Sequence, residues 1–156
     1  MSIANECRSW LVSSRMAGVT LLELLVTVAI TGILGAIAYP SYMQYIIRTN
    51  SAVAKSVLLR VADRQEQFFG DNKRYATDLS QLGYATNGFM IDDQGALVGN
   101  ADTARRFAIS LSNATATTFT ANAAPQLNQA AHDQCQTLTL THTGLKDQTG
   151  PGANCW

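Results

Sequence analysis

Residues 18–47 decide the fold, and they read GVTLLELLVTVAITGILGAIAYPSYMQYII. Glu23 is the one charged residue in this stretch, and no position from Leu24 to Ile47 carries a charge. About 20 apolar residues are enough for an α-helix to cross the hydrocarbon core of a bilayer. A carboxylate in such a segment costs free energy and therefore indicates a functional role. The stretch predicts a membrane-spanning helix whose single charge has a partner.

The remainder of the chain has the composition of one modest domain. The chain has 156 residues, and Lys+Arg and Asp+Glu are both 11, so the formal net charge is zero. This balance does not support wholesale binding of nucleic acid or of acidic substrates. Small and polar residues are frequent after the first third, as in exposed β-structure and loops. We therefore expect a water-exposed head to follow the apolar helix.

An ordinary secretory signal fits the apolar stretch poorly. Such a signal has 7–15 apolar residues followed by a small-residue cleavage site. Here the apolar run is longer, and no such site precedes Arg48. A plain membrane anchor is the simplest alternative. The Lys and Arg residues on the two sides of the run do not decide its orientation.

The spacing of Gly18, Thr20 and Glu23, with the apolar run that follows, closely resembles the prepilin signature of type IV pilins and related pseudopilins. Val19 departs from the pattern, since phenylalanine or methionine is usual there. Pro40 lies where many type IV pilins have a helix-kinking proline. The segments 71–84 and 135–156 resemble those of a subgroup of minor pilins, so the resemblance touches most of the chain except about 86–104 and 121–134.

The resemblance implies that prepilin peptidase removes the leader and retains the apolar helix. Cleavage would fall between Gly18 and Val19, and the new amino terminus of Val19 would be methylated. The implied organisation is a leader (1–18), a membrane or filament-core segment (19–47) and a periplasmic head (48–156). The chain would be anchored in the inner membrane before assembly and would lie in an extracellular pilus afterwards.

The resemblance also implies the partners and their contact residues. Glu23, with Thr20 beside it, would guide assembly by attracting the amino terminus of Val19 on a neighbouring subunit. The partners are then other pilin subunits, prepilin peptidase and the inner-membrane assembly machinery. We expect a minor pilin that supports pilus biogenesis, twitching motility or adhesion. A type II secretion pseudopilin and a DNA-uptake receptor pilin are the alternatives.

The first helix is expected to begin near Thr20 and to run to about Phe69, with Gly70 as its stop signal. Pro40 removes the N–H that would bond the Ala36 carbonyl, and Gly32 and Gly35 precede it. The two interpretations are a kinked membrane helix and a segment that unwinds during assembly. Beyond Pro40 the helix becomes amphipathic, with an apolar stripe of Ile47, Ala54, Leu58, Val61, Phe68 and Phe69.

The head is expected to be a small antiparallel sheet, which makes the fold class α+β. Alternating patterns predict strands at 107–112, 117–121 and 136–141. A weaker fourth strand falls around 89–91 or 96–98. A short helical turn is expected at 77–82 and a turn at 92–95.

Three cysteines are present, namely Cys7, Cys135 and Cys155. Removal of the leader would take Cys7 away and leave the other two on the oxidising side of the membrane, where disulfides persist. We therefore expect a Cys135–Cys155 bond, with two free thiols as the alternative. A loop of that size contributes about 3 kcal/mol in the chain-entropy model.

No catalytic or cofactor motif is evident, so we expect no enzyme, no cofactor and no metal site. His132 and His142 lack neighbours at zinc-ligand spacing and are expected at the surface. The three residues Asp92, Asp93 and Asp102 lack EF-hand spacing. The basic pairs 73–74 and 105–106 are only a weak footprint for DNA.

Overall fold

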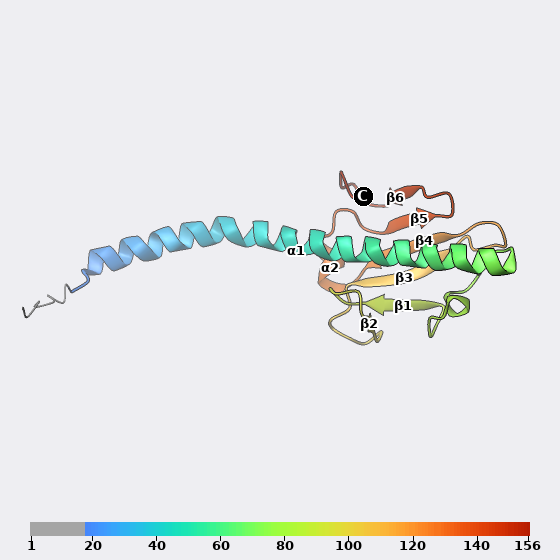
Figure 1. The fold of residues 1–156 in the computed structure, drawn as a ribbon. Coiled ribbons are helices and arrows are strands. Elements are labelled where there is room, and N and C mark those ends of the chain that lie inside the picture. Colours follow the sequence, from blue (N-terminus) through green and yellow to red (C-terminus); the bar gives the residue numbers. More distant parts are fainter. Residues whose placement is uncertain (1–17) are drawn as a thin grey trace, which may run out of the picture. The chain divides into compact units, whose positions relative to one another are not determined.

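A computed structural model describes residues 18–156 of the chain (Figure 1). The predicted leader up to residue 17, including Cys7, lies outside the described residues. The chain divides between Tyr39 and Pro40 into two compact units. The two units are therefore described separately.

The first unit is the beginning of α1 (Leu21–Asn72), up to Tyr39. All of its described residues are exposed in the isolated chain. The helix contains a window that is long and apolar enough to cross a bilayer, and none of that window is buried. The Thr27 hydroxyl donates to the Leu24 carbonyl at 2.9 Å and the Thr31 hydroxyl to the Thr27 carbonyl at 2.8 Å. These two hydroxyls thus find acceptors within the helix and need none from an apolar environment.

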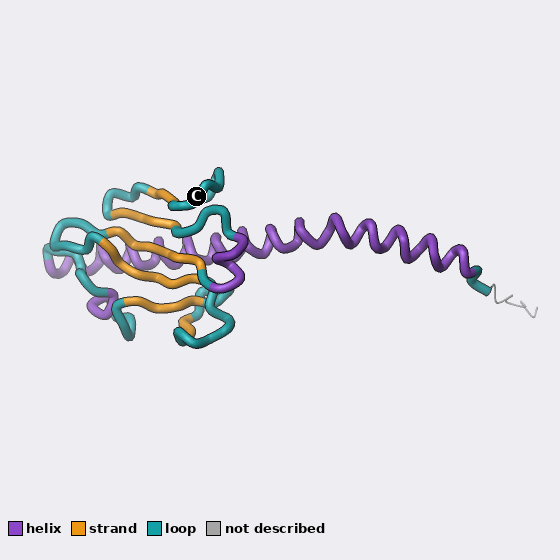
Figure 2. The backbone as a smooth tube through the Cα atoms, turned by 180° about the vertical axis from the view of Figure 1, so that it is seen from behind, coloured by secondary structure: helices purple, strands orange, loops and turns teal. Residues whose placement is uncertain are grey.

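The second unit, residues 40–156, combines the remainder of α1 with a six-stranded antiparallel sheet (Figure 2). The spatial order of the strands is β2-β1-β3-β4-β5-β6. A 3₁₀ turn, η1 (Leu79–Leu82), precedes the sheet, and a short helix, α2 (Leu127–His132), follows β4. The strands are β1 (Gly88–Ile91), β2 (Leu97–Val98), β3 (Phe107–Ser112), β4 (Thr120–Pro125), β5 (Leu138–Thr141) and β6 (Lys146–Gln148). The predicted α+β class is confirmed.

The core of the head lies between α1 and one face of the sheet. Ala54, Leu58 and Val61 on α1 are completely buried, which confirms the centre of the predicted apolar stripe. They pack against the inward residues of the strands, including Phe107 and Leu138. Alternate positions along β1, β4 and β5 are buried, as expected for a sheet with one face covered.

Gln65 is a polar member of this core and is fully buried. Its Nε2 donates to the Ala76 carbonyl at 2.9 Å, and its Oε1 accepts from the Ala76 N–H at 2.8 Å. The side-chain amide thus satisfies both backbone groups of one loop residue. This pair of bonds fastens the chain that leaves α1 to the helix.

The prediction that Gly70 stops the first helix is wrong, because α1 continues to Asn72. Lys73 follows it in the left-handed conformation, with φ 57°. The Asn72 side chain donates to the Phe68 carbonyl and the Lys73 ammonium to the Gly70 carbonyl. These side chains satisfy the last carbonyls, so the helix ends without a glycine at that point.

The predicted strand at 117–121 is shifted, because β4 begins at Thr120 and extends to Pro125. Thr115 and Thr118 form a turn instead: the Thr115 Oγ1 accepts from the Thr118 N–H at 3.1 Å, and the Thr118 hydroxyl donates to the Asn113 carbonyl at 3.0 Å. Threonine hydroxyls compete with strand hydrogen bonds in this way.

The other predicted elements are largely confirmed. The strand at 107–112, the turn at 92–95 and the helical turn within 77–82 all form, and β5 occupies the end of the predicted strand at 136–141. Both weak candidates become strands, as β1 and β2. Neither α2 nor β6 was predicted from the sequence.

Candidate functional site

The first candidate site is the beginning of α1, where the predicted cleavage and assembly residues lie together. The Thr20 Oγ1 accepts a hydrogen bond from the Glu23 N–H at 3.2 Å, and the Thr20 carbonyl accepts from the Leu24 N–H at 3.2 Å. Thr20 is therefore the N-cap of α1. The cap fixes Glu23 in the first turn, close to Val19.

Glu23 completes only half of a capping box. In the pattern Thr-x-x-Glu, the glutamate side chain ordinarily reaches back to the N–H of the capping residue. Here the Glu23 carboxylate has no hydrogen-bond or ion-pair partner among residues 18–156. It lies at the positive end of the helix dipole, which favours a negative charge. The carboxylate is thus in place to accept a positive group from another molecule.

The apolar residues around Glu23 also lack partners in the isolated chain. Leu21, Leu22 and Leu25 are exposed by 76%, 73% and 63%, and Val19 by 67%. Apolar surface of this extent in one contiguous stretch marks contact with lipid or with another protein. Gly18 is exposed as well, so the Gly18–Val19 peptide bond is open to an enzyme.

The predicted kink residues fall in different units. At Gly32 and Gly35 an added Cβ would meet nothing within 4 Å in the isolated chain. Pro40 lies inside α1, which continues through it as helix. The kink itself stays a prediction. The open space at the two glycines would allow a second helix to approach closely.

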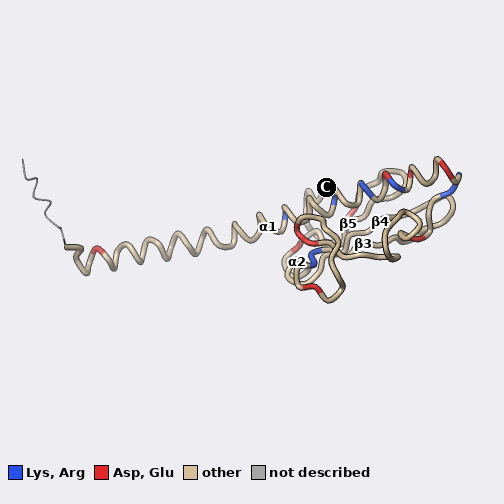
Figure 3. The backbone as a smooth tube through the Cα atoms, turned by 60° about the horizontal axis from the view of Figure 1, so that its bottom comes forward, with Lys and Arg blue, Asp and Glu red and all other residues tan. Residues whose placement is uncertain are grey.

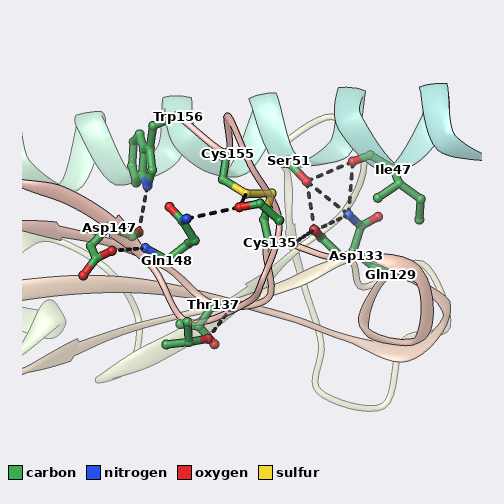
Figure 4. The surroundings of a disulfide bond; sticks show 12 residues. Ile47, Ser51, Gln129, Asp133, Cys135, Thr137, Asp147, Gln148, Cys155 and Trp156 are labelled. Atoms are coloured by element: carbon green, nitrogen blue, oxygen red, sulfur yellow. Dashed lines mark hydrogen bonds between the residues drawn. A yellow bond between two sulfur atoms is a disulfide. The ribbon is translucent and has the colours of Figure 1, made fainter.

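The second candidate site is the C-terminal part of the head, which a disulfide closes. Cys135 and Cys155 are bonded, with their Cα atoms 5.6 Å apart, so the predicted pairing is confirmed (Figure 4). The Gly150 N–H donates to the Cys135 carbonyl at 3.1 Å. A Cβ on Gly150 would lie 2.1 Å from the Gln134 carbonyl oxygen. The loop therefore needs glycine at this position to lie against residue 134.

A buried polar cluster connects this loop to α1, and no pattern in the sequence predicted it. The Asp133 Oδ2 accepts from the Gln129 Nε2 at 2.8 Å and from the Ser51 hydroxyl at 2.9 Å (Figure 4). The Asp133 Oδ1 accepts from the Cys135 N–H at 2.9 Å, and the Gln129 Oε1 accepts from the Asn50 amide at 3.0 Å. The cluster thus connects α1, α2 and the disulfide loop.

Each polar side chain of the cluster is nearly excluded from water. Gln129 is 1% exposed and Asp133 4% exposed. No cation of the described chain pairs with Asp133, so hydrogen bonds alone stabilise its carboxylate. Buried polar groups of this kind are costly when one partner is removed. The cluster can therefore hold the disulfide loop in one position on α1.

Metal chemistry finds no support in residues 18–156, where no group of three His, Cys, Asp or Glu side chains could hold an ion. His132 is exposed, as expected. His142 is half-buried, with its ring centroid 6.2 Å from that of Tyr75. Asp92 instead organises its own turn, where its Oδ1 accepts from the N–H groups of Gln94 and Ala96, both at 2.9 Å.

Two family models match the sequence of this chain. Residues 40–139 match the family model described as "Type IV minor pilin ComP, DNA uptake sequence receptor". The chain belongs to this family of type IV minor pilins. Residues 13–39 of the pilin match the prokaryotic N-terminal methylation motif. The two matches adjoin at Tyr39 and Pro40.

Two further proteins are similar to parts of this pilin. The type IV major pilin protein PilA of Myxococcus xanthus (strain DK1622) is 38% identical over 71 residues, which are 46% of this chain and 32% of that protein. The chain thus spans about a third of that relative. The solved structure of a type IV pilin from Shewanella oneidensis is 23% identical, with a TM-score of 0.43, over 66% of this chain and 89% of that chain.

Proposed function

We propose that this pilin is a minor structural subunit of a type IV pilus and has no catalytic role. The observation that carries the proposal is the unpaired Glu23 carboxylate on an exposed apolar helix. A chain built in this way is incomplete alone, because its apolar residues need lipid before assembly and other helices afterwards. Membership of the minor pilin family supports the same function.

Processing precedes assembly in this proposal. Prepilin peptidase cuts between Gly18 and Val19 and methylates Val19, which the matched methylation motif supports. The leader is 1–18, the membrane or filament-core segment 19–47, and the head 48–156. The new amino group of Val19 lies one residue before the cap Thr20, and therefore at the same end of α1 as Glu23.

Assembly then follows from charge and apolar packing. The Glu23 carboxylate of one subunit attracts the Val19 amino group of a neighbour, which places the incoming helix in register. An unpaired charge in a low-dielectric environment is costly, so the pairing favours the correct register over others. The open positions at Gly32 and Gly35 would let helices approach. Pro40, which lies inside α1, is the residue expected to kink the helix.

The head lies in the periplasm before assembly and on the extracellular filament afterwards. The Cys135–Cys155 bond supports an oxidising compartment. A type II secretion pseudopilin shares the N-terminal motif and is the alternative. The minor pilin family match favours the pilus. The inner-membrane assembly machinery of the pilus completes the partners.

Mass spectrometry of sheared surface filaments from the native host tests this function. We expect the chain in the filaments at a low ratio to the major subunit, with N-methyl-Val19 as its first residue. Absence of the chain from filaments that are otherwise normal would contradict the proposal. A secretion defect with intact pili on deletion of the chain would favour the pseudopilin.

DNA uptake is the second candidate function, because the matched family model names a DNA uptake sequence receptor. The basic residues of the head give only limited support to DNA binding. Arg105 donates to the Asp102 carbonyl at 2.8 Å, and Arg106 donates to the Thr103 carbonyl at 3.3 Å. Figure 3 shows the basic residues of the head spread along α1 and the loops rather than joined in one stripe.

A binding measurement on the full chain in detergent micelles tests DNA binding separately from assembly. The affinity for a labelled DNA duplex is measured by fluorescence anisotropy. It should fall steeply as the salt concentration rises if phosphate contacts dominate. The double variant Lys73→Glu, Arg74→Glu should then lower affinity, while the distant Lys146→Glu should not. A DNA affinity that changes neither with salt concentration nor in these variants would argue against a receptor function.

A further inference from the structure

The two edges of the sheet differ, and the β2 edge is open. The Asp92 N–H donates to the Ala96 carbonyl at 3.1 Å, which makes that pair hydrogen-bonded. Leu97, opposite Ile91, therefore occupies a non-hydrogen-bonded position. The Leu97 N–H and C=O point away from β1, and no residue among 18–156 bonds to them. One donor and one acceptor are thus free at this edge.

A small hollow lies beside this edge, between β2 and α1. Its volume is about 150 Å³, and Val57, Arg60 and Arg64 of α1 form one side of it. Leu97 forms part of the other side and is 62% exposed. An apolar side chain is therefore left uncovered beside two guanidinium groups.

Arg64 is held rigidly in this hollow. Its Nη1 donates to the Leu82 carbonyl at 2.9 Å, and its guanidinium lies 4.6 Å from the centroid of the Tyr84 ring. Tyr84 in turn stacks on Phe89, with the centroids 4.4 Å apart. The guanidinium loses little further freedom when it binds a ligand.

The two arginines have no negative partner. No acidic side chain lines the hollow, and neither Arg60 nor Arg64 forms an ion pair within residues 18–156. Arg60 is exposed to solvent. The hollow therefore favours a ligand that carries a carboxylate or another anionic group.

The opposite edge, β6, is partly covered by its own side chains. The Asp147 Oδ1 accepts from the Gln148 N–H at 2.8 Å, and the Trp156 indole donates to the Asp147 carbonyl at 2.7 Å. The Lys146 ammonium lies 5.6 Å from the centroid of the Trp156 ring. Lys146, opposite Leu140 and next to the hydrogen-bonded pair Thr141 and Leu145, also directs its N–H and C=O away from β5. The charged and bulky side chains around it disfavour pairing with another strand. Of the two edges, β2 alone combines free backbone groups with an anion-binding hollow.

We propose that the β2 edge and the arginine hollow accept an extended, acidic segment of a neighbouring pilin subunit. The segment would add to β2 as a further strand through Leu97, and its carboxylate would bind Arg60 and Arg64. A peptide offers both a donor and an acceptor to Leu97, whereas a DNA phosphate offers acceptors alone. The source of the segment rests on the proposed function as a pilus subunit.

Photo-crosslinking in the native host tests the proposal on the full chain. Leu97 is replaced by p-benzoylphenylalanine, the cells are irradiated, and the sheared filaments are analysed by mass spectrometry. We expect a crosslink to a segment of a pilin subunit that contains Asp or Glu within a few residues of the attachment point. The same amino acid at Lys146, on the edge that lacks the arginine hollow, should give no such product.

Charge reversal sharpens the test. Arg60→Glu should lower the yield of the crosslink about tenfold, as expected when a charged pair becomes repulsive. A lysine in place of the acid found in the partner segment should restore the yield in the Arg60→Glu background. Lys146→Glu, a matched charge reversal on the opposite edge, should leave the yield unchanged.

The outcomes separate this inference from the proposed function. If the chain is present in filaments in normal amount but gives no crosslink at position 97, the inference alone is overturned. A crosslink yield that Arg60→Glu does not change also overturns the inference alone. A crosslink to DNA overturns it in favour of a nucleic-acid site. Absence of the chain from filaments contradicts both proposals.

Discussion

The exposed start of α1 and the packed head differ in whether their apolar and charged groups find partners within the chain. Residues 18–39 bury nothing in the isolated chain, whereas residues 40–156 enclose an apolar core, a buried polar cluster and a disulfide. The head satisfies the buried Asp133 carboxylate internally, with hydrogen bonds from three parts of the chain. The Glu23 carboxylate, at the other extreme, has no hydrogen-bond or ion-pair partner within residues 18–156. The satisfied Asp133 carboxylate is expected to stabilise the head, and we propose that the unsatisfied Glu23 carboxylate guides assembly.

Replacing Gly18 should have the largest effect of the changes considered, because an uncleaved precursor cannot bring its first helix to its proposed partners. Replacement of Gly18 by phenylalanine should abolish cleavage and leave the full precursor in the membrane. Intact-mass analysis of the membrane fraction measures this. A chain that still begins at Val19 would show that cleavage does not depend on this residue.

Removal of the disulfide should most strongly weaken the head. Cys155→Ser should lower the free energy of unfolding by about 2–5 kcal/mol, because the unfolded chain gains the freedom of the opened loop. Near-UV circular dichroism during denaturant unfolding of the full chain in micelles measures the loss. A change below about 1 kcal/mol would mean that hydrogen bonds such as Gly150 to Cys135 hold the loop without the bond.

Breaking the buried polar cluster should have an intermediate effect. Asp133→Ala leaves the Ser51 hydroxyl, the Gln129 amide and the Cys135 N–H without their acceptor, which should lower the free energy of unfolding by about 1–3 kcal/mol. The exposed Asp93→Ala is the matched control and should stay within about 0.5 kcal/mol of the unchanged protein. Equal stability of the two variants would show that the cluster does not stabilise the head.

The smallest expected change in the free energy of unfolding appears only at alkaline pH. Burial, followed by the hydrogen bond and the charge of Glu66, raises the pKa of Tyr75 above its ordinary value of 10.0. The folded state therefore favours the protonated phenol. The stabilisation that Tyr75 gives to the folded state is fully present below pH 10 and is lost as the pH rises through the raised pKa. Tyr75→Phe should reduce the alkaline loss of unfolding free energy. Identical pH profiles for the unchanged protein and Tyr75→Phe would contradict the assignment.

The two regions also differ in how well the sequence predicts them. The start of α1 depends on local pattern alone, namely the cap Thr20, the charge at Glu23 and an unbroken apolar run, so its beginning was predicted to within a residue. The disulfide was predictable because resemblance to a known family left only two cysteines in the head. Local chemistry and family pattern were sufficient in both cases.

The head was less predictable because tertiary contacts override local preference there. The alanines of β4 are weak strand formers, yet Ala121 and Ala123 are completely buried between β3 and β5. Thr118 was predicted to lie in a strand, but it forms a turn with Thr115 and Asn113 through threonine hydroxyls. The partners Ser51 and Asp133 are far apart in sequence, and no periodicity connects them.

The central claim is that the unpaired carboxylate of Glu23 recruits this subunit into the filament. The direct measurement compares the amounts of Glu23→Ala, Glu23→Gln and unchanged protein in sheared filaments, with Asp93→Ala as a control for loss of an exposed acid. Membrane insertion and cleavage after Gly18 should be unaffected in every variant, which intact mass verifies. We expect strong depletion of both Glu23 variants from filaments and normal levels of Asp93→Ala. Normal filament levels of Glu23→Ala and Glu23→Gln would contradict the claim.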